Sequence, residues 1–114
     1  MAKINRLTKV VNTFQKFPES IRTYALSKAM GSVVKYAGTS GLRYEKLTPT
    51  ECIIVIPNRK KVRNHIGSVH AAAMGLLAET ATGFMTGLTV PDDRIIVIKS
   101  MHLEYLKQAS GDMK

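Results

Sequence analysis

One acidic side chain lies in the middle of a long uncharged stretch. Glu79 is the only charged residue between Ala71 and Val90, in the sequence AAAMGLLAETATGFMTGLTV. A carboxylate on a buried helix is costly unless it is paired, hydrogen-bonded or protonated. Two interpretations are open at this point. Either Glu79 pairs with one of the many cations or reaches water at an interface, or it is a catalytic carboxylate in a cleft.

The helix that carries Glu79 is predicted within residues 64–87. This stretch opens with a glycine-containing loop and continues for about five helical turns through strong helix formers. Ser68 is expected to cap the helix start, and Gly87 with Pro91 marks its end. At 100° per residue, mostly small residues surround Glu79 on one face, and bulky apolar residues occupy the other. The helix is therefore expected to be covered on most sides, with its bulky face on a sheet.

The remaining elements predict an α+β protein with an antiparallel sheet. Residues 2–16 have the apolar spacing of an amphipathic helix that is expected to pack on the domain, although its basic polar face also permits binding to a membrane surface. A second helix follows from Pro18. Residues 38–41 (GTSG) read as a loop, 42–47 and 51–56 as a hairpin, and 94–106 as a long strand. Three strands cannot wrap a five-turn helix, and residues 110–112 read as a turn into a further strand. The C-terminal strands are missing from this pattern, so either the chain is truncated or another copy completes the sheet.

Composition and charge limit the class of protein. The 114 residues suffice for one domain, and the net charge of +9 favours a polyanionic partner such as nucleic acid, an anionic membrane or a phosphorylated small molecule. The four cations that cluster, Arg59, Lys60, Lys61 and Arg63, come with no nucleic-acid-binding motif, so no specific nucleic acid is expected. No apolar run is long enough to cross a bilayer, and a single cysteine, Cys52, fits a reducing, cytoplasmic compartment. No Cys/His cluster has metal-ligand spacing.

The segment NHIGSVHAAAMGLLAETATG resembles the core motif of hotdog-fold acyl-CoA thioesterases, especially the phenylacetate-pathway-like branch and a related, poorly characterised branch. That pattern has an Asn or Gln six residues before a His, usually Gly-Gly after the His, and an acid nine residues after it. The matching residues here are Asn64, His70, Ala71-Ala72 and Glu79. Upstream, residues 38–67 are similar to the family's first two strands, and 99–112 to its third. The resemblance implies a hotdog domain over 38–114, in which an antiparallel sheet wraps the central helix, preceded by a helical segment over 1–37.

The resemblance also implies an activity, the hydrolysis of acyl-CoA thioesters. Glu79 would act as general base on water or as nucleophile, and the Ala71 amide, helped by Asn64, would stabilise the oxyanion. Nine residues turn a helix through 900°, so His70 and Glu79 lie on opposite sides of it. The site would therefore be shared between subunits of a homodimer, which could pair further into a homotetramer. Coenzyme A would be part of the substrate, with no other cofactor and no metal.

Further residues are expected to contact the substrate. His70 is expected to shape the helix start, and two departures from the family pattern affect this site: Ala71-Ala72 replaces Gly-Gly, and Gly83 stands where a hydroxyl sometimes orients water, next to Thr82. The basic residues could bind the nucleotide phosphates of coenzyme A or form only a solvated loop. Two other functions stay open, a non-catalytic acyl-CoA or lipid-binding hotdog module and a polyanion-binding protein. The substrate-binding candidates are Gly67, His70, Ala72, Thr82, Gly83, Arg59, Lys61 and Arg63.

Overall fold

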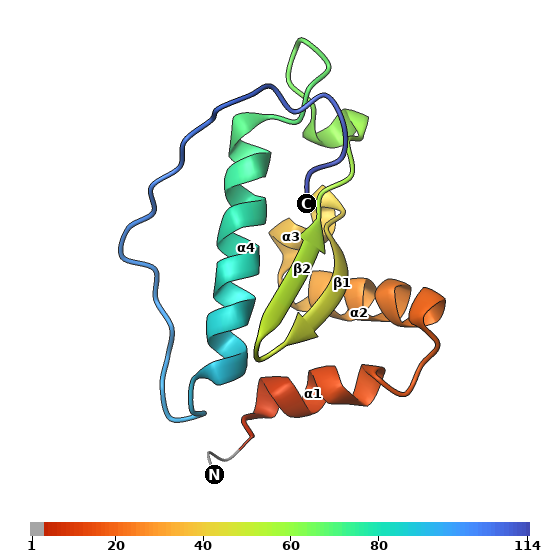
Figure 1. Cartoon of the computed structure of the whole chain (residues 1–114), viewed down its shortest axis with the longest axis vertical. Helices are drawn as coiled ribbons and strands as arrows, with labels where there is room; N and C mark the ends of the chain where they lie inside the picture. The colour runs from red at the N-terminus through yellow and green to blue at the C-terminus, as the bar shows by residue number, and fades with distance from the viewer. Residues whose placement is uncertain (1–3) are drawn as a thin grey trace.

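A long helix, α4, lies between a β-hairpin and an extended C-terminal segment (Figure 1). The computed structural model describes residues 4–114, so the part of the predicted first helix at residues 2 and 3 lies outside the described chain. The elements are α1 (Arg6–Phe14), α2 (Glu19–Val33), α3 (Lys35–Ser40), β1 (Arg43–Thr48), β2 (Glu51–Val55), the 3₁₀ turn η1 (Lys60–Val62) and α4 (Ala71–Thr89). The architecture is a small α+β domain with a two-stranded antiparallel sheet and one long helix, consistent with a hotdog-like fold.

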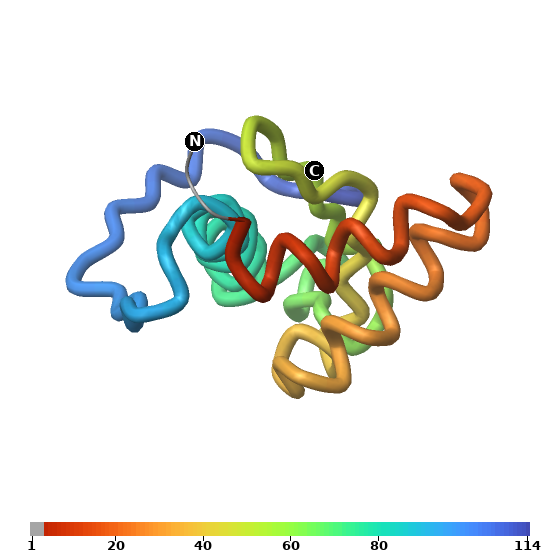
Figure 2. The backbone as a smooth tube through the Cα atoms, turned by 90° about the horizontal axis from the view of Figure 1, so that it is seen from below, coloured from red at the N-terminus to blue at the C-terminus, as the bar shows by residue number. Residues whose placement is uncertain are grey.

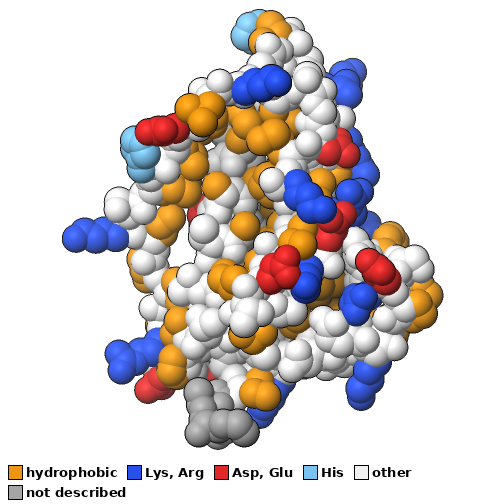
Figure 3. Space-filling model, viewed as in Figure 1, with side chains coloured by type: hydrophobic (Ala, Val, Ile, Leu, Met, Phe, Trp, Pro, Cys, Tyr) orange, Lys and Arg blue, Asp and Glu red, His pale blue; other side chains and the backbone are white. Residues whose placement is uncertain are grey.

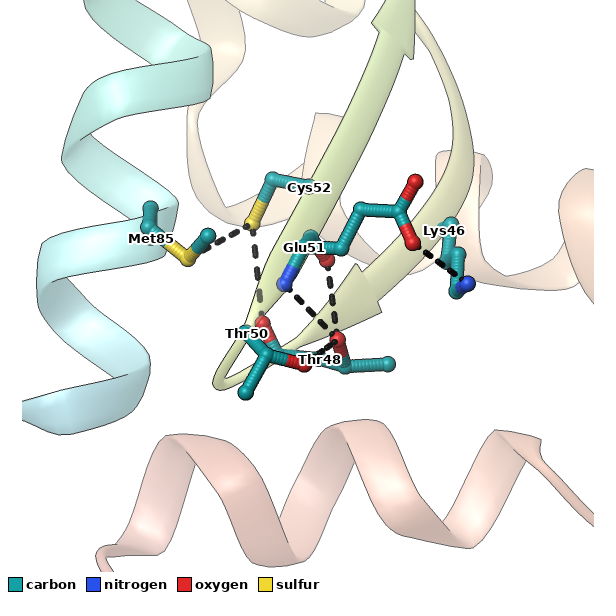
Figure 4. Close-up of polar contacts among 6 residues, drawn as sticks. All are labelled: Lys46, Thr48, Thr50, Glu51, Cys52 and Met85. Atoms are coloured by element: carbon teal, nitrogen blue, oxygen red, sulfur yellow. Dashed lines mark hydrogen bonds and ion pairs between the residues drawn. The ribbon is translucent and has the colours of Figure 1, made fainter.

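The predicted hairpin is confirmed to within one residue at each end. Strands β1 and β2 pair antiparallel, with Leu47 opposite Cys52. The Thr48 hydroxyl accepts a hydrogen bond from the Glu51 backbone amide at 2.9 Å and donates to the Glu51 carbonyl at 3.1 Å, which closes the turn (Figure 4). Tyr44 and Leu47 are buried, so one face of the hairpin forms core against the helices.

The N-terminal helices pack into the same core as the hairpin. The predicted amphipathic first helix is confirmed as α1, which lies across the end of α4 (Figure 2). Asn5 joins the two helices: its Oδ1 accepts from the Thr8 amide at 2.8 Å, and its Nδ2 donates to the carbonyls of Gly87 and Val90 at 2.7 and 2.6 Å. One side chain therefore caps the start of α1 and satisfies carbonyls at the end of α4.

The predicted loop at residues 38–41 is wrong, because α3 continues to Ser40. The two glycines in this stretch have different roles. Gly41 ends α3 in the left-handed conformation, with φ of 73°. Gly38 lies inside α3, where a side chain would not fit because α2 approaches closely. A Cβ at this position would be 2.4 Å from the Gly31 carbonyl oxygen. The composition indicated a turn, but one of its glycines serves helix packing instead.

The cap of helix α4 lies two residues later than predicted. The cap is His70 rather than Ser68: the His70 Nδ1 accepts from the Ala72 amide at 3.0 Å. Ser68 is buried in the preceding loop, where its hydroxyl contacts the Gln108 side chain. The bulky face packs as predicted, with Leu77 and Leu88 buried in the core. On the face that carries Glu79, Gly75 and Leu76 are buried, so the expected cover is only partial. The exposed residues of this face in the single chain are Ala72, Glu79, Thr82, Gly83 and Thr86.

The predicted strand at residues 94–106 is wrong. This segment runs back along α4 in extended form without pairing to any strand of the described chain (Figure 1). Its apolar side chains are largely open to solvent along one edge of the molecule, with Ile95 91% and Leu106 89% exposed (Figure 3). Strand propensity favours extended backbone, but a ladder also needs a neighbouring strand edge. Beyond the turn at 110–112, only Met113 pairs with the sheet, at Ile56.

Candidate functional site

Two of the predicted catalytic residues meet at the start of α4. Asn64 and Ala71 line one hollow of about 350 Å³, together with Ser68, Met74, Tyr105 and Gln108 among others. The hollow is built from the loop before α4, the first turn of the helix and the returning C-terminal segment. The six-residue spacing from Asn64 to His70 thus places an amide side chain beside the first free amide of a helix.

The loop holds Asn64 through its side-chain oxygen. The Asn64 Oδ1 accepts from the amides of Ile66 and Ser68 at 3.0 and 3.1 Å, and Gly67 takes the left-handed conformation, with φ of 80°, that closes the turn. Because the oxygen is committed to the loop, the side-chain nitrogen remains as a donor. That nitrogen donates to no atom of residues 4–114.

The first amides of α4 have different partners. The Ala72 amide donates to the His70 ring, whereas the Ala71 amide has no acceptor within residues 4–114. The N-terminal end of a 19-residue helix carries partial positive charge, which favours negative charge on a ligand. The Ala71 carbonyl accepts from the Tyr105 hydroxyl at 3.1 Å, which ties the C-terminal segment to this end of the helix. His70 therefore shapes the helix start, as the sequence predicts.

Glu79 does not reach this hollow. It lies eight residues beyond Ala71, about 12 Å along the helix axis, and its side chain is exposed. The expectation that Glu79 occupies a dry groove is not met within one chain. Of its predicted neighbours, Thr82 donates its hydroxyl to the Ala78 carbonyl at 2.9 Å, and Gly83 faces open space. Within the described chain, Glu79 forms no ion pair or side-chain hydrogen bond.

A second, apolar hollow adjoins the first. It has a volume of about 460 Å³ and lies between β2 and α4, where its walls include Cys52, Ile53, Leu77 and Ala81. Met74 lines both hollows, so the two meet at this side chain. Sequence reasoning missed this groove because its walls come from a strand and a helix whose relative placement no local pattern specifies.

Cys52 is half-buried in this groove. Its Sγ lies 3.9 Å from the Met85 Sδ (Figure 4). Burial raises the pKa of the Cys52 thiol, which disfavours the thiolate. The half-buried Cys52 thiol on β2 is therefore suited to packing rather than to nucleophilic attack.

The predicted basic residues separate into two groups. Arg63 is held by Asn58, to which its Nε and Nη2 donate at 2.8 and 3.1 Å. Arg59 and Lys61 instead line a third hollow, about 800 Å³, against α2 and α3. Residues 4–114 hold no cluster of three or more His, Cys, Asp or Glu side chains that could bind a metal ion. None of the helices in the same range is long and apolar enough to cross a membrane.

The protein is a small α+β domain in which a long helix packs against a hairpin. A hollow with free hydrogen-bond donors lies at the start of this helix. The model of the family described as "Domain of unknown function (DUF4442)" matches residues 22–114, and the chain belongs to this family. The chain is also similar to a solved protein described as "Crystal Structure of genomics APC5556". The two share 29% sequence identity with a TM-score of 0.75, over 93% of this chain and 69% of the other. No curated protein matches the sequence.

Proposed function

We propose that this protein hydrolyses acyl-CoA thioesters at a site formed by two copies of the chain. The observation that carries the proposal is the pair of free donors at the start of α4, the Ala71 amide and the Asn64 side-chain nitrogen, in one hollow. Hydrogen-bond donors at a helix start suit a carbonyl oxygen that gains negative charge during acyl transfer. The resemblance of residues 64–83 to the core motif of hotdog-fold thioesterases supports the same activity.

The reaction follows from these positions. The thioester carbonyl oxygen accepts hydrogen bonds from Ala71 and Asn64. Glu79 of a second copy takes a proton from water as the water oxygen attacks the carbonyl carbon. The tetrahedral intermediate then collapses, the carbon–sulfur bond breaks, and the sulfur leaves with a proton as the thiol of coenzyme A. A carboxylic acid is the other product. Attack by the Glu79 carboxylate itself, through an anhydride, is the alternative route to the same products.

A second copy is needed because one chain separates the donors from the acid. Glu79 lies about 12 Å along α4 from Ala71 and does not line the hollow at the helix start. The exposed face around it has only small side chains, which let another helix or backbone approach closely. We therefore propose a homodimer, alone or within a dimer of dimers, in which each α4 offers Glu79 to its partner.

The acyl group has a groove available. The apolar hollow between β2 and α4 meets the polar one at Met74, so an acyl chain could extend from the thioester carbonyl into it. Apart from Lys114, the walls are aliphatic and sulfur-containing side chains, which are suited to an apolar chain.

Thiol release from a panel of short, aromatic and long-chain acyl-CoAs tests the proposal. The Glu79→Gln variant should bind substrate and lose thiol release, because glutamine keeps the shape but cannot accept the proton. Asp93→Asn, an equivalent change in the turn after α4, is the matched control and should keep full activity. Turnover that is unchanged in Glu79→Gln would refute the assigned role.

The alternative function is a non-catalytic acyl-CoA or lipid-binding module. The exposed position of Glu79, outside the hollow at the helix start, favours it. The same panel separates the two functions. Saturable acyl-CoA binding by the native protein with no thiol release would establish the binding module.

A further inference from the structure

The hollow against helices α2 and α3 is lined by positive charge. Helices α2 and α3, the start of β1 and the segment after β2 enclose about 800 Å³. Five cationic side chains and no carboxylate line it: Lys28, Lys35, Arg43, Arg59 and Lys61. Arg43 is paired with Glu45 at 3.2 Å. The other four form no ion pair or hydrogen bond with any side chain or backbone group of residues 4–114.

Two of these cations converge on one point. A Cβ built on Gly41 would lie 3.2 Å from the Lys61 Nζ and 3.7 Å from the Arg59 Nη1. Like charges this close repel unless an anion lies between them. Gly41 ends α3, and the carbonyls of a helix end attract cations. Neither side chain donates to a described carbonyl, however, so capping of α3 does not account for their position.

The remaining wall supplies neutral donors and an aromatic face. The hydroxyls of Ser20, Thr23 and Thr39 line the hollow and form no side-chain hydrogen bond within residues 4–114. Tyr24 is 67% exposed, and the Lys28 ammonium lies 5.6 Å from its ring centroid. Phosphate oxygens accept from lysine, arginine and hydroxyl groups, and an aromatic face can stack on a base.

We propose that this hollow binds the clustered phosphates of a nucleotide, independently of the hydrolytic site. Its volume lies within the range of small-molecule sites. Nucleotide phosphates have two sources, a free nucleotide and the nucleotide end of coenzyme A. The cations lie inside a concave site between helices rather than along a ridge, which favours a small ligand over a nucleic-acid duplex.

Calorimetric titration of the whole chain tests the proposal. Pyrophosphate, ADP and 3′,5′-ADP should bind, whereas pantetheine, which has no phosphate, should not. Coenzyme A binding more tightly than ADP would identify the nucleotide end of coenzyme A as the source, because that nucleotide also carries a 3′-phosphate. ADP binding as tightly as coenzyme A, or more tightly, would identify the free nucleotide.

Variants inside and outside the hollow make the test specific. The double variant Arg59→Gln/Lys61→Gln should weaken ADP binding by more than about tenfold, since two charged contacts to phosphate are lost. Lys60→Gln removes a neighbouring charge that does not line the hollow, and should weaken binding by less than about twofold. Pyrophosphate should raise the melting temperature of the native chain but not that of the double variant. Without anion, the double variant should melt at the same temperature as the native chain or higher, because two like charges are gone.

Three results would overturn the proposal. The first is that neither pyrophosphate nor ADP binds at ligand concentrations up to about 1 mM. The second is an equal loss of affinity in Lys60→Gln and the double variant. The third is binding of unrelated duplexes with steep salt dependence and no affinity for pyrophosphate. Loss of thiol release alone would leave these readouts unchanged, so this proposal and the hydrolytic one fail separately.

Discussion

Replacement of Ala71 by proline removes the backbone N–H that the proposed hydrolysis requires and should disturb little else. Ala71 is the first residue of α4, and its amide has no acceptor within residues 4–114. Proline is favoured at this helical position, because its missing N–H was unpaired and its φ is suited to a helix. The residue before proline must be extended, and His70 already has φ of −63° and ψ of 144°. Ala71→Pro should therefore fold like the native chain.

The size of the expected loss follows from the role of the amide. Removal of one oxyanion donor from a preorganised site lowers kcat by about 10²–10³, equivalent to about 2.7–4 kcal/mol of transition-state stabilisation. KM should change little, because the lost hydrogen bond is strongest when the oxygen carries negative charge. Ala71→Gly keeps the N–H and is the control: it should retain kcat within a few fold.

The assay is steady-state thiol release, with circular dichroism and melting temperature measured on the same samples. The reasoning predicts a folded Ala71→Pro variant with a large loss in kcat and an active Ala71→Gly variant. A folded proline variant that hydrolyses acyl-CoA at the native rate would show that the start of α4 does not stabilise the oxyanion.

Three further predictions concern stability. Tyr44→Phe should raise the free energy of unfolding by about 1 kcal/mol in urea titration, because the Tyr44 hydroxyl is fully buried with no partner in the described chain; a loss instead would mean that the hydroxyl is satisfied. Asn5→Ala should lower it by about 2 kcal/mol, since one cap and two carbonyl contacts of α4 disappear; an unchanged value would contradict the bridge between α1 and α4. Burial raises the pKa of Tyr44 to about 12, so stability present below pH 10 should fall by roughly 2–3 kcal/mol as pH rises to about 12. That decline should be smaller in Tyr44→Phe, and an equal decline in both would place its cause elsewhere.

Local patterns predicted the elements whose partners are close in sequence. The hairpin followed from the β-branched run at 51–56, the mixed run at 42–47 and the short turn Thr48-Pro49-Thr50 between them. Helix α4 followed from its alanines, leucines and bounding glycines. The family resemblance grouped Asn64 with Ala71 at the helix start, and the structure places both on the wall of one hollow. These parts needed only local chemistry.

The errors concern contacts between distant segments. Residues 94–106 have strand-forming side chains, but pairing depends on a free strand edge that the described chain does not offer them. Gly38 suggested a loop, because the close approach of Gly31 from another helix cannot be read from composition. Glu79 was expected in a dry groove, yet its exposure depends on what covers α4, which local sequence does not specify. The cationic hollow was likewise unforeseen, since α2 and α3 contribute most of its wall.

The central claim is that the donors of one copy and the acid of another form each site, and mixed dimers test it most directly. Two differently tagged chains, Ala71→Pro and Glu79→Gln, are co-expressed, and the dimer that carries both tags is purified. One of its two shared sites would combine an intact Ala71 amide with an intact Glu79, so the account predicts about half of the native thiol release. A dimer of the native chain with the double variant Ala71→Pro/Glu79→Gln should be nearly inactive. The reverse result, an inactive first dimer and a half-active second, would place the whole site within one chain and contradict the account.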